Sequence, residues 1–345
     1  MAQVSFEVKR LHLRHNWTTT MSSSAYRETV HLRYTNLGIT GLGEGAPILR
    51  YNESAASTLA ALEQVRPVLE AADPWQHTPL LDHLRKLLPN QRAALAAIDL
   101  ALNDWLGRSL NVATYKLFGL DPENIPHTSF SIGIDTPAIT RQKTRDAAAY
   151  QVLKIKVGLD TDEETIAAVR SMTDKPLRVD ANEGWTDPEE AIRKINWLET
   201  QGVELIEQPM PAHMSAEIRY VRGKVHLPLF ADEACTSAQS IPGLRESYDG
   251  INVKIDKAGG LFEAQRWIAI ARACHLRVML GCMISSSLST TAAAHLAPLA
   301  DLVDLDGALL LADDPYEGMQ VSEGRIRLPT APGLGVTARS FMWSP

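Results

Sequence analysis

Cysteine is scarce in this chain, and its scarcity limits the kinds of protein it can be. The 345 residues include 3 cysteines, an odd number without the spacing of a metal site. They argue against a disulfide-stabilised scaffold and indicate reduced thiols in a cytoplasmic protein. Long apolar runs are also missing, since no segment approaches the roughly 18 residues of a membrane span. The start, MAQVSFEVKRLHLRHNW, alternates in polarity and predicts a strand, not a signal peptide.

Positive charge is in short supply as well. Lys and Arg number 34 against 41 Asp and Glu, which leaves a net charge of −7. Nucleic acids and anionic membranes bind clustered Lys and Arg, so neither is expected as the main partner. The chain does contain 45% hydrophobic residues, enough for a sizeable globular core. Its length fits one large domain or two ordinary ones.

The first part of the chain has the pattern of a small α+β domain. From residue 4 to about 47 the polarity alternates with period two, which predicts an antiparallel sheet. The segment NWTTTMSSSAYR, residues 16–27, is polar and rich in hydroxyls and is expected to be a mobile loop between the first two strands. Helices are predicted over residues 54–70, 77–88 and 90–107. We therefore expect an α+β domain over residues 1–125.

From about residue 128 the pattern changes to alternating strands and helices. Eight strands of this kind indicate a parallel barrel with right-handed crossovers over residues 126–322. Residues 323–345 contain an extended stretch that is expected to return to the first domain. The predicted barrel strands are SFSIGI, VLKIKVG, LRVDAN, LIEQPM, PLFADEA, GINVKID, VMLGCM and LVDLDG.

Charged residues recur along the predicted barrel at nearly constant intervals. The intervals are 24, 27, 25, 22 and 50 residues. One strand, one helix and their loops take about 25 residues, so a residue repeated at this interval lies at the same end of the barrel each time. Barrel enzymes keep their active sites at one such end. The recurring residues are Lys156, Asp180, Glu207, Asp232, Lys254 and Asp304.

Three of these residues are candidate metal ligands. Asp180, Glu207 and Asp232 each end a short apolar strand. Carboxylates without Cys or His suit a hard cation such as Mg²⁺. Any one of them alone could instead be a loop or helix-capping residue. Three in the same register of consecutive strands favour the metal site.

The lysines are candidate bases. Lys154 and Lys156 are two residues apart on one strand, so both are expected to point into the barrel mouth. Burial beside a second cation would lower the pKa of such a lysine and leave a neutral amine. Surface lysines are the alternative. Lys254 lies on the sixth strand, across the barrel, and Lys257 is expected beyond the strand end with a structural role.

Asp304 and Asp306 form an acidic pair in LVDLDG, at the end of the eighth strand. Two carboxylates beyond the metal would attract a positive group, for example a substrate ammonium. A loop Asp followed by a turn Asp before Gly307 is the alternative. Their place at the same end of the barrel as the other charges favours the binding role.

The order of KIK, VDAN, IEQP, ADEA, NVKIDKAGG and GCM resembles the enolase superfamily, muconate-lactonizing subgroup, over nearly the whole chain. The resemblance implies a modified TIM barrel, (β/α)₇β, with an N-terminal α+β capping domain, an α/β fold. It implies Mg²⁺ on Asp180, Glu207 and Asp232. It also implies acid/base roles for Lys156 and Lys254 with Lys154 as a helper, and a homo-oligomer.

Within the subgroup, the acidic pair is similar to that of the dipeptide epimerases, where it binds the free α-ammonium. The implied reaction is 1,1-proton transfer at the α-carbon of the C-terminal residue of an L-Ala-L-Xaa dipeptide, through an enediolate. Arg27, or alternatively Arg50, could bind an acidic substrate side chain. Tyr51 and Ser285 are further expected substrate contacts, and Asn182 and Glu233 are expected beside the metal ligands.

Two other functions remain open at this point. A cycloisomerase or an o-succinylbenzoate synthase uses a similar site, but their substrates carry no ammonium for Asp304 and Asp306. The other is a non-catalytic barrel that binds metal or dipeptide, in which the apposed Lys156 and Lys254 would have no function.

Overall fold

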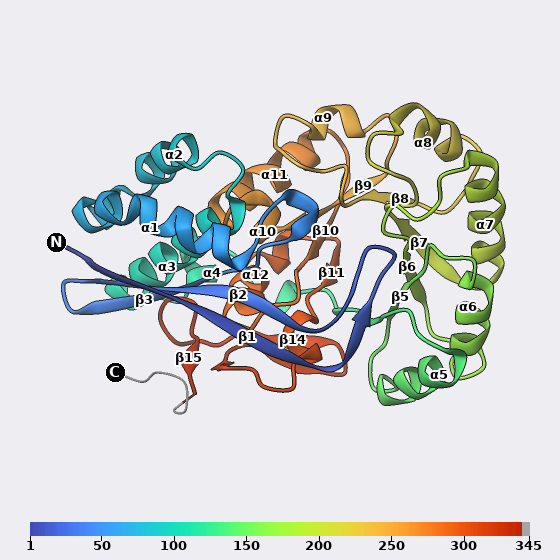
Figure 1. The fold of residues 1–345 in the computed structure, drawn as a ribbon, viewed down its shortest axis with the longest axis horizontal. Coiled ribbons are helices and arrows are strands. Elements are labelled where there is room, and N and C mark those ends of the chain that lie inside the picture. Colours follow the sequence, from blue (N-terminus) through green and yellow to red (C-terminus); the bar gives the residue numbers. More distant parts are fainter. Residues whose placement is uncertain (340–345) are drawn as a thin grey trace.

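The structure is a computed structural model that describes residues 1–339, so positions 340–345 of the predicted C-terminal segment lie outside the described residues. Figure 1 shows an N-terminal α+β capping domain packed against a barrel, with the long β1–β2 hairpin reaching across to the barrel strands. None of the helices in residues 1–339 combines the length and the apolar character needed to cross a membrane.

The capping domain contains the predicted antiparallel sheet, in the order β1-β2-β3. Three helices pack with it, and the first is capped by Ser54, whose side chain and that of Ser57 form a capping box. The sheet strands are β1 (Gln3–Thr18), β2 (Ser23–Asn36) and β3 (Ile39–Gly45), and the helices are α1 (Ala55–Ala71), α2 (His77–Leu87) and α3 (Arg92–Leu110).

The hydroxyl-rich segment 16–27 is mostly strand, which corrects the prediction of a loop. Strand β1 continues to Thr18 and β2 begins at Ser23, so the turn between them is four residues long. The Thr18 and Ser23 hydroxyls are 2.8 Å apart. Side-chain hydroxyls paired across the ladder satisfy each other, and β-branched Thr favours strands, so polar residues here support the hairpin.

Strand β3 lies directly against helix α3 because every second residue is glycine. A Cβ atom at Gly41, Gly43 or Gly45 would overlap a carbonyl oxygen of α3. The opposite face of the strand carries Leu42 and Glu44 towards the barrel, and both are buried. Because these glycines have no side chains, the backbone of β3 can approach α3 closely while its other face packs on the barrel.

The barrel has the predicted (β/α)₇β order. Within residues 1–339, eight parallel strands pair in sequence from β4 to β11. The two end strands approach each other where Ser129 N donates to Val303 O over 3.1 Å, which nearly closes the sheet. The strands are β4 (Phe130–Ile132), β5 (Leu153–Lys156), β6 (Leu177–Asp180), β7 (Val203–Glu207), β8 (Leu229–Ala231), β9 (Gly250–Lys254), β10 (Arg277–Gly281) and β11 (Leu302–Asp304).

Seven helical connections join these strands, and the eighth strand is followed by the 3₁₀ turn η5 (Gly307–Leu310) in place of a barrel helix. The sixth connection begins with a short additional helix, α10 (Ile255–Ala258). The connecting helices are α5 (Pro137–Asp146), α6 (Asp162–Arg170), α7 (Pro188–Thr200), α8 (Ser215–Arg222), α9 (Ile241–Leu244), α11 (Leu261–Ala273) and α12 (Ser287–Ala294).

A small apolar cluster lies inside the barrel below the charged residues. Leu205, Phe230 and Met279 form a buried cluster, with Leu302 packed against it. Side chains two residues apart on a strand point to the same side, so the next inward residues are Glu207, Asp232, Gly281 and Asp304. The charged layer therefore lies above a partly apolar interior, which also holds the buried guanidinium of Arg178. Buried charges interact more strongly than charges in water.

Buried carboxylates of the capping domain bind the first turns of two barrel helices. Glu44 of β3 accepts from Ser286 N and Ser289 N, at 3.0 and 3.1 Å, at the start of α12. Asp99 of α3 accepts from Phe262 N, at 2.9 Å, in the first turn of α11. Helix N-termini carry unpaired N–H groups and favour negative charge. These contacts hold the capping domain on one side of the barrel.

The chain after the barrel runs back along α3. Leu334 N donates to Asp104 Oδ1 over 2.8 Å, and Thr114 N donates to Gly333 O over 2.9 Å. The short ladder between β12 (Tyr316–Glu317) and β15 (Thr337–Ala338) lies in the same region of the sequence.

Candidate active site

The six charged residues with the regular spacing lie at one end of the barrel. Lys156, Asp180 and Glu207 are direct partners across neighbouring strands. Lys254 and Asp304 both pair with Gly281 on β10, which lies between their strands. Each residue is the last of its strand, except Asp232, which follows β8. The interval in the sequence thus corresponds to a common register in the sheet.

Asp180, Glu207 and Asp232 form a compact set of carboxylates. One oxygen from each lies within 4.8 Å of the others, and all three side chains are buried. Asn252 Nδ2 donates to Glu207 Oε1 over 2.8 Å and orients that carboxylate. A buried set made only of carboxylate oxygens fits a hard divalent cation such as Mg²⁺.

The two candidate bases are ion-paired with different members of this set. Lys156 Nζ is 2.5 Å from Asp180 Oδ2, and Lys254 Nζ is 2.7 Å from Asp232 Oδ2. Lys154 Nζ lies 2.7 Å from Glu207 Oε2 and 2.6 Å from Asp304 Oδ2, and 3.2 Å from Asp180 Oδ2. The metal carboxylates therefore lie between an ammonium group on β5 and another on β9.

The lowering of lysine pKa that was expected on β5 does not occur at Lys154, and the pKa of Lys254 on β9 is raised as well. Burial opposes the charged form of each, but the neighbouring carboxylates outweigh it and raise the pKa of both above the ordinary value. The expectation, made for the two lysines of β5, considered only the second cation. It left out the carboxylates of the same layer, which are in direct contact with Lys154.

Lys257 is a site residue whose importance the sequence reasoning missed. It lies past the strand end, in α10, as predicted, but its ammonium turns back to the metal set. Nζ donates to Asp232 Oδ1, to Asp232 O at 2.7 Å and to Asn252 O at 2.9 Å. The three-residue interval from Lys254 could have shown this, because residues three apart in a helical turn lie on one face.

Asp304 and Asp306 have different surroundings, although they were predicted to act as a pair. Asp304 accepts from Lys154 and, through Oδ1, from the Ser129 hydroxyl at 2.8 Å. Burial disfavours its charge, yet Lys154 lowers the pKa of Asp304 to about 2. Asp306 accepts from Ser131 N at 2.6 Å, and burial together with the charge of Asp304 raises its pKa to about 7. Asp304 forms an ion pair with Lys154, whereas Asp306 has no lysine bound to it in residues 1–339.

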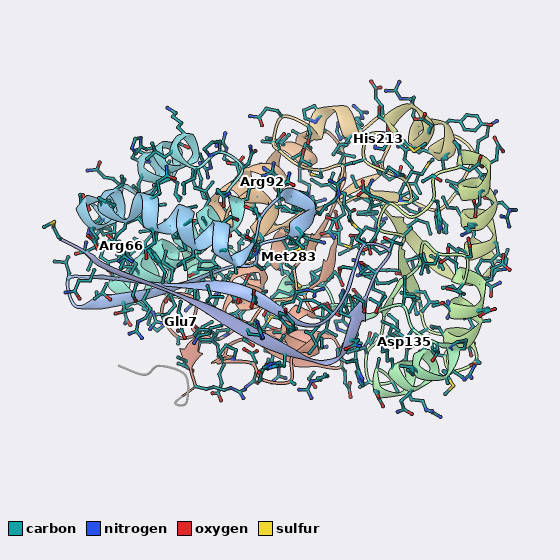
Figure 2. All side chains as sticks on the ribbon, viewed as in Figure 1. Glu7, Arg66, Arg92, Asp135, His213 and Met283 are labelled. Carbon is teal, nitrogen blue, oxygen red and sulfur yellow. The ribbon has the colours of Figure 1, made fainter. Side chains whose placement is uncertain are left out.

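A cavity of about 550 Å³ joins these groups to the capping domain. It is lined by Lys154, Lys156, Lys254, Asp304 and Asp306 from the barrel and by the β1–β2 hairpin and the segment around residues 46–55 from the capping domain. Met283, also in its wall, lies in the view of Figure 2 near the middle of the molecule, between the capping helices and the barrel helices.

The two candidate arginines differ in what they bind. Arg50 Nε and Nη2 donate to the carboxylate of Glu183, at 2.8 and 3.0 Å, so its charge is already paired. Arg27 lines the cavity, donates to Tyr26 O over 3.0 Å, and forms no ion pair with any carboxylate in residues 1–339. Burial lowers its pKa. A half-buried guanidinium without an acidic partner favours an anionic ligand.

The remaining predicted residues lie close to the site, with one exception. Tyr51 lines the cavity. Asn182 N donates to Asp180 Oδ1 over 3.0 Å, and its amide Nδ2 donates to Glu233 Oε1 over 3.2 Å. Ser285, expected to contact substrate, does not line the cavity. It is fully buried, and its hydroxyl donates to Met283 O over 3.2 Å.

A parallel barrel with a carboxylate metal set and apposed lysines at the carboxyl ends of its strands defines a metal-dependent barrel enzyme. Comparison with protein families agrees. Residues 4–119 match the mandelate racemase / muconate lactonizing enzyme N-terminal domain, and residues 138–341 match the enolase C-terminal domain-like family. The chain belongs to the mandelate racemase/muconate lactonizing enzyme family of the enolase superfamily.

Its relatives include named epimerases. The chain is 38% identical to the L-Ala-D/L-Glu epimerase of Bacteroides thetaiotaomicron, over 97% of this chain and 87% of the relative. It is also 38% identical to the L-Ala-D/L-amino acid epimerase of Pedosphaera parvula, over 98% and 100%. The Enterococcus faecalis dipeptide epimerase, solved with Mg and L-Leu-L-Tyr, has a TM-score of 0.91 and 31% identity, with 97% and 99% covered.

A further solved structure shares the fold at lower identity. It is the substrate-liganded L-Ala-D/L-Glu epimerase of Bacillus subtilis, which has a TM-score of 0.92 and 29% identity, with 97% of this chain and 98% of that chain covered.

Proposed function

We propose that this protein is a Mg²⁺-dependent dipeptide epimerase that moves a proton at the α-carbon of the C-terminal residue of an L-Ala-L-Xaa dipeptide. The observation that carries the proposal is the position of Lys156 and Lys254, which pair with different metal carboxylates in one cavity. Inverting a carbon centre by proton transfer needs a base on one face and an acid on the other. The relatives that carry epimerase names support the same reaction.

Asp180, Glu207 and Asp232 would hold the metal. When bound, Mg²⁺ would offset their charge and stabilise the negative charge that develops on the substrate carboxylate as the α-proton leaves. Lys156 then takes the proton from one face and Lys254 returns one to the other, with exchanged roles for the opposite enantiomer. The carbon acid is much weaker than a lysine ammonium, so electrostatic stabilisation must remove most of the barrier.

The acidic pair favours a free amino terminus on the substrate. Asp306 lines the cavity and binds no lysine within residues 1–339, so its carboxylate can accept the α-ammonium. The substrates of the cycloisomerase and o-succinylbenzoate synthase reactions have no such group. A buried carboxylate without a cation is costly, and those substrates would leave Asp306 in that state.

We further propose that the second residue of the dipeptide is acidic, with L-Ala-L-Glu as the preferred substrate. Arg27 supports this choice, since its guanidinium faces the cavity without an acidic partner in the described chain. Arg50 does not serve this role, because Glu183 already binds it. The relative named for L-Ala-D/L-Glu epimerisation agrees with an acidic residue.

The proposal also covers assembly and location. The resemblance to the family supports a homo-oligomer, which light scattering on the purified chain would test. Free thiols at Cys235, Cys274 and Cys282 support a cytoplasmic enzyme.

Mass spectrometry of an L-Ala-L-Xaa library, incubated with the protein and Mg²⁺ in D₂O, tests the function. A gain of one deuterium on particular dipeptides is expected, greatest for L-Ala-L-Glu. If no dipeptide exchanges its α-proton while the protein binds Mg²⁺, the epimerase assignment fails and the cycloisomerase reaction becomes the leading alternative.

A further inference from the structure

Gln208 follows the metal ligand Glu207, at the end of β7, and it has no role in the chemistry described above. Its side chain is fully buried and does not line the cavity. Its backbone has a φ of 36°, in the left-handed region that side chains rarely adopt. Such a conformation persists only where surrounding contacts hold it, and it is most frequent at functional sites.

The side chain of Gln208 uses all of its polar atoms. Oε1 accepts from Asp232 N at 3.0 Å and from Ala234 N at 3.1 Å. The amide nitrogen, Nε2, donates to Met210 O at 2.7 Å and to Tyr248 Oη at 3.1 Å. The acceptor end therefore holds the turn that carries the metal ligand Asp232, and the donor end is anchored away from it.

The backbone of Gln208 forms hydrogen bonds to strand β8 and to the loop after β6, the segments next to the other two metal carboxylates. Its N–H donates to Phe230 O, on β8, at 2.8 Å. Its carbonyl accepts from Glu183 N, in the loop after Asp180, at 2.9 Å. One residue thus makes hydrogen bonds to the loops or strands that carry each of the other two carboxylates.

We propose that Gln208 is a positioning residue that fixes Asp232 relative to Glu207 and thereby sets the affinity for Mg²⁺. The two ligands belong to adjacent strands, but Asp232 lies one residue beyond the end of β8, outside the ladder. Ladder hydrogen bonds cannot hold it there, and the Gln208 amide takes their place. Residues that orient metal ligands in this way typically contribute 10–100-fold in metal affinity.

The inference rests on the proposed function only for the identity of the metal, and its test needs no dipeptide. Titration calorimetry with Mg²⁺ is made on the wild type, on Gln208→Met and on Tyr248→Phe. Methionine has a similar length but forms none of the four side-chain hydrogen bonds. Phenylalanine at position 248 removes only one of the two hydrogen bonds at the anchored end, and Tyr248 does not line the cavity.

For Gln208→Met we expect Mg²⁺ to bind 10–100-fold more weakly than to the wild type, and for Tyr248→Phe less than about threefold more weakly. Thermal unfolding and circular dichroism establish that each variant is folded at the titration temperature. If Gln208→Met does not fold, Gln208→Leu or Gln208→Asn replaces it, since neither can reach both backbone N–H groups and keep the present geometry.

A folded Gln208 variant that binds Mg²⁺ as the wild type does, while its melting temperature falls, would overturn the proposal and leave Gln208 a packing residue. A wild type that binds Mg²⁺ but epimerises no dipeptide would contradict the proposed function and leave this inference standing. As a second readout, proton exchange by Gln208→Met should recover when Mg²⁺ is raised to saturation, because Lys156 and Lys254 are unchanged.

Discussion

Lys154 Nζ lies 2.6 Å from Asp304 Oδ2 and 2.7 Å from Glu207 Oε2, so one ammonium group joins the acidic pair to the metal set. Asp304 has its second oxygen bonded to the Ser129 hydroxyl. Asp304 and Asp306, which look like one binding motif in the sequence, therefore have different partners in the structure. Asp304 binds Lys154, and Asp306 lines the cavity, where the proposed function assigns it to the substrate ammonium.

This division predicts different kinetic effects for the two carboxylates. Asp306→Asn should raise KM for a dipeptide by about 10–100-fold with a smaller change in kcat, because it removes one charge-assisted hydrogen bond to the ammonium. Asp304→Asn should lower kcat more than it changes KM, because it releases Lys154. Steady-state kinetics at saturating Mg²⁺ measures both, and equal effects on KM would contradict the division.

Replacing one base should separate proton exchange from epimerisation. Lys156→Ala and Lys254→Ala should each lower the epimerisation rate by a factor of about 10² to 10⁴, the usual contribution of a positioned acid or base. Each variant should still exchange the α-proton of one enantiomer with D₂O, and the two variants should prefer opposite enantiomers. Proton NMR of L-Ala-L-Glu and L-Ala-D-Glu shows this directly. Epimerisation at the wild-type rate without either lysine would exclude the two-base scheme.

Arg27 should determine the preference for an acidic residue. Arg27→Met is expected to lower kcat/KM for L-Ala-L-Glu by about 10–100-fold, the effect of one lost charged hydrogen bond, and to leave L-Ala-L-Leu nearly unchanged. Arg50→Met is the matched control. It breaks the ion pair with Glu183 and should affect both dipeptides alike. Equal losses for both dipeptides in Arg27→Met would contradict an acidic side-chain site.

The packing of β3 on α3 predicts a large stability effect from one methyl group. Gly43→Ala should lower the free energy of unfolding by about 1–3 kcal/mol or more, because the new Cβ would overlap the Ala97 carbonyl oxygen. Gly243→Ala is the control, since nothing lies within 4 Å of its Cβ position. It lies in helix α9 and should be neutral or slightly stabilising. Urea unfolding compares the two variants with the wild type.

Asp99 predicts a pH dependence of stability. Burial raises its pKa from the ordinary 3.8 to about 7, so between these values the folded state binds more protons than the unfolded one. Stability from this group is therefore full below about pH 4 and is lost as the pH rises towards 7. Asp99→Asn should remove the dependence, and its stability relative to the wild type should rise over this range by at most about 4 kcal/mol. Urea unfolding at pH 4.5 and 7.5 tests it, and a constant difference would contradict the shift.

The fold and most of the site could be predicted because their signals repeat. Each barrel strand from β5 to β11 ends in a charged or small residue, at an interval near 25. Because the pattern repeats over several units, chance does not account for the alignment of Lys156, Asp180 and Glu207. Residues two apart on a strand share a face, so the inward direction of Lys154 also followed. The family resemblance then connected these positions to a metal and two bases.

The remaining features depend on single contacts between distant segments. No local sequence pattern indicates that Glu44 contacts Ser286 or that Glu183 binds Arg50. The sequence alone therefore gives no reason to prefer Arg27 over Arg50 as the residue that binds an acidic side chain. The same holds for the lysine pKa values, which depend on carboxylates from other strands. The sequence predicts a loop in the hydroxyl-rich segment because the cross-strand pair of the Thr18 and Ser23 hydroxyls cannot be seen in either strand alone.

The contact between Glu44 and Ser286 joins residues 242 positions apart. On a ribosome that adds roughly 5–20 residues each second, the carboxylate must wait about 12–50 seconds for its partner to be made. During that time α3 and β3 can form together, but the face of β3 that will meet the barrel stays exposed to water. Strand β3 is also the last strand of its sheet. The charge of Glu44 on the exposed face of β3 would protect the nascent chain from premature association at this strand until α12 is synthesised.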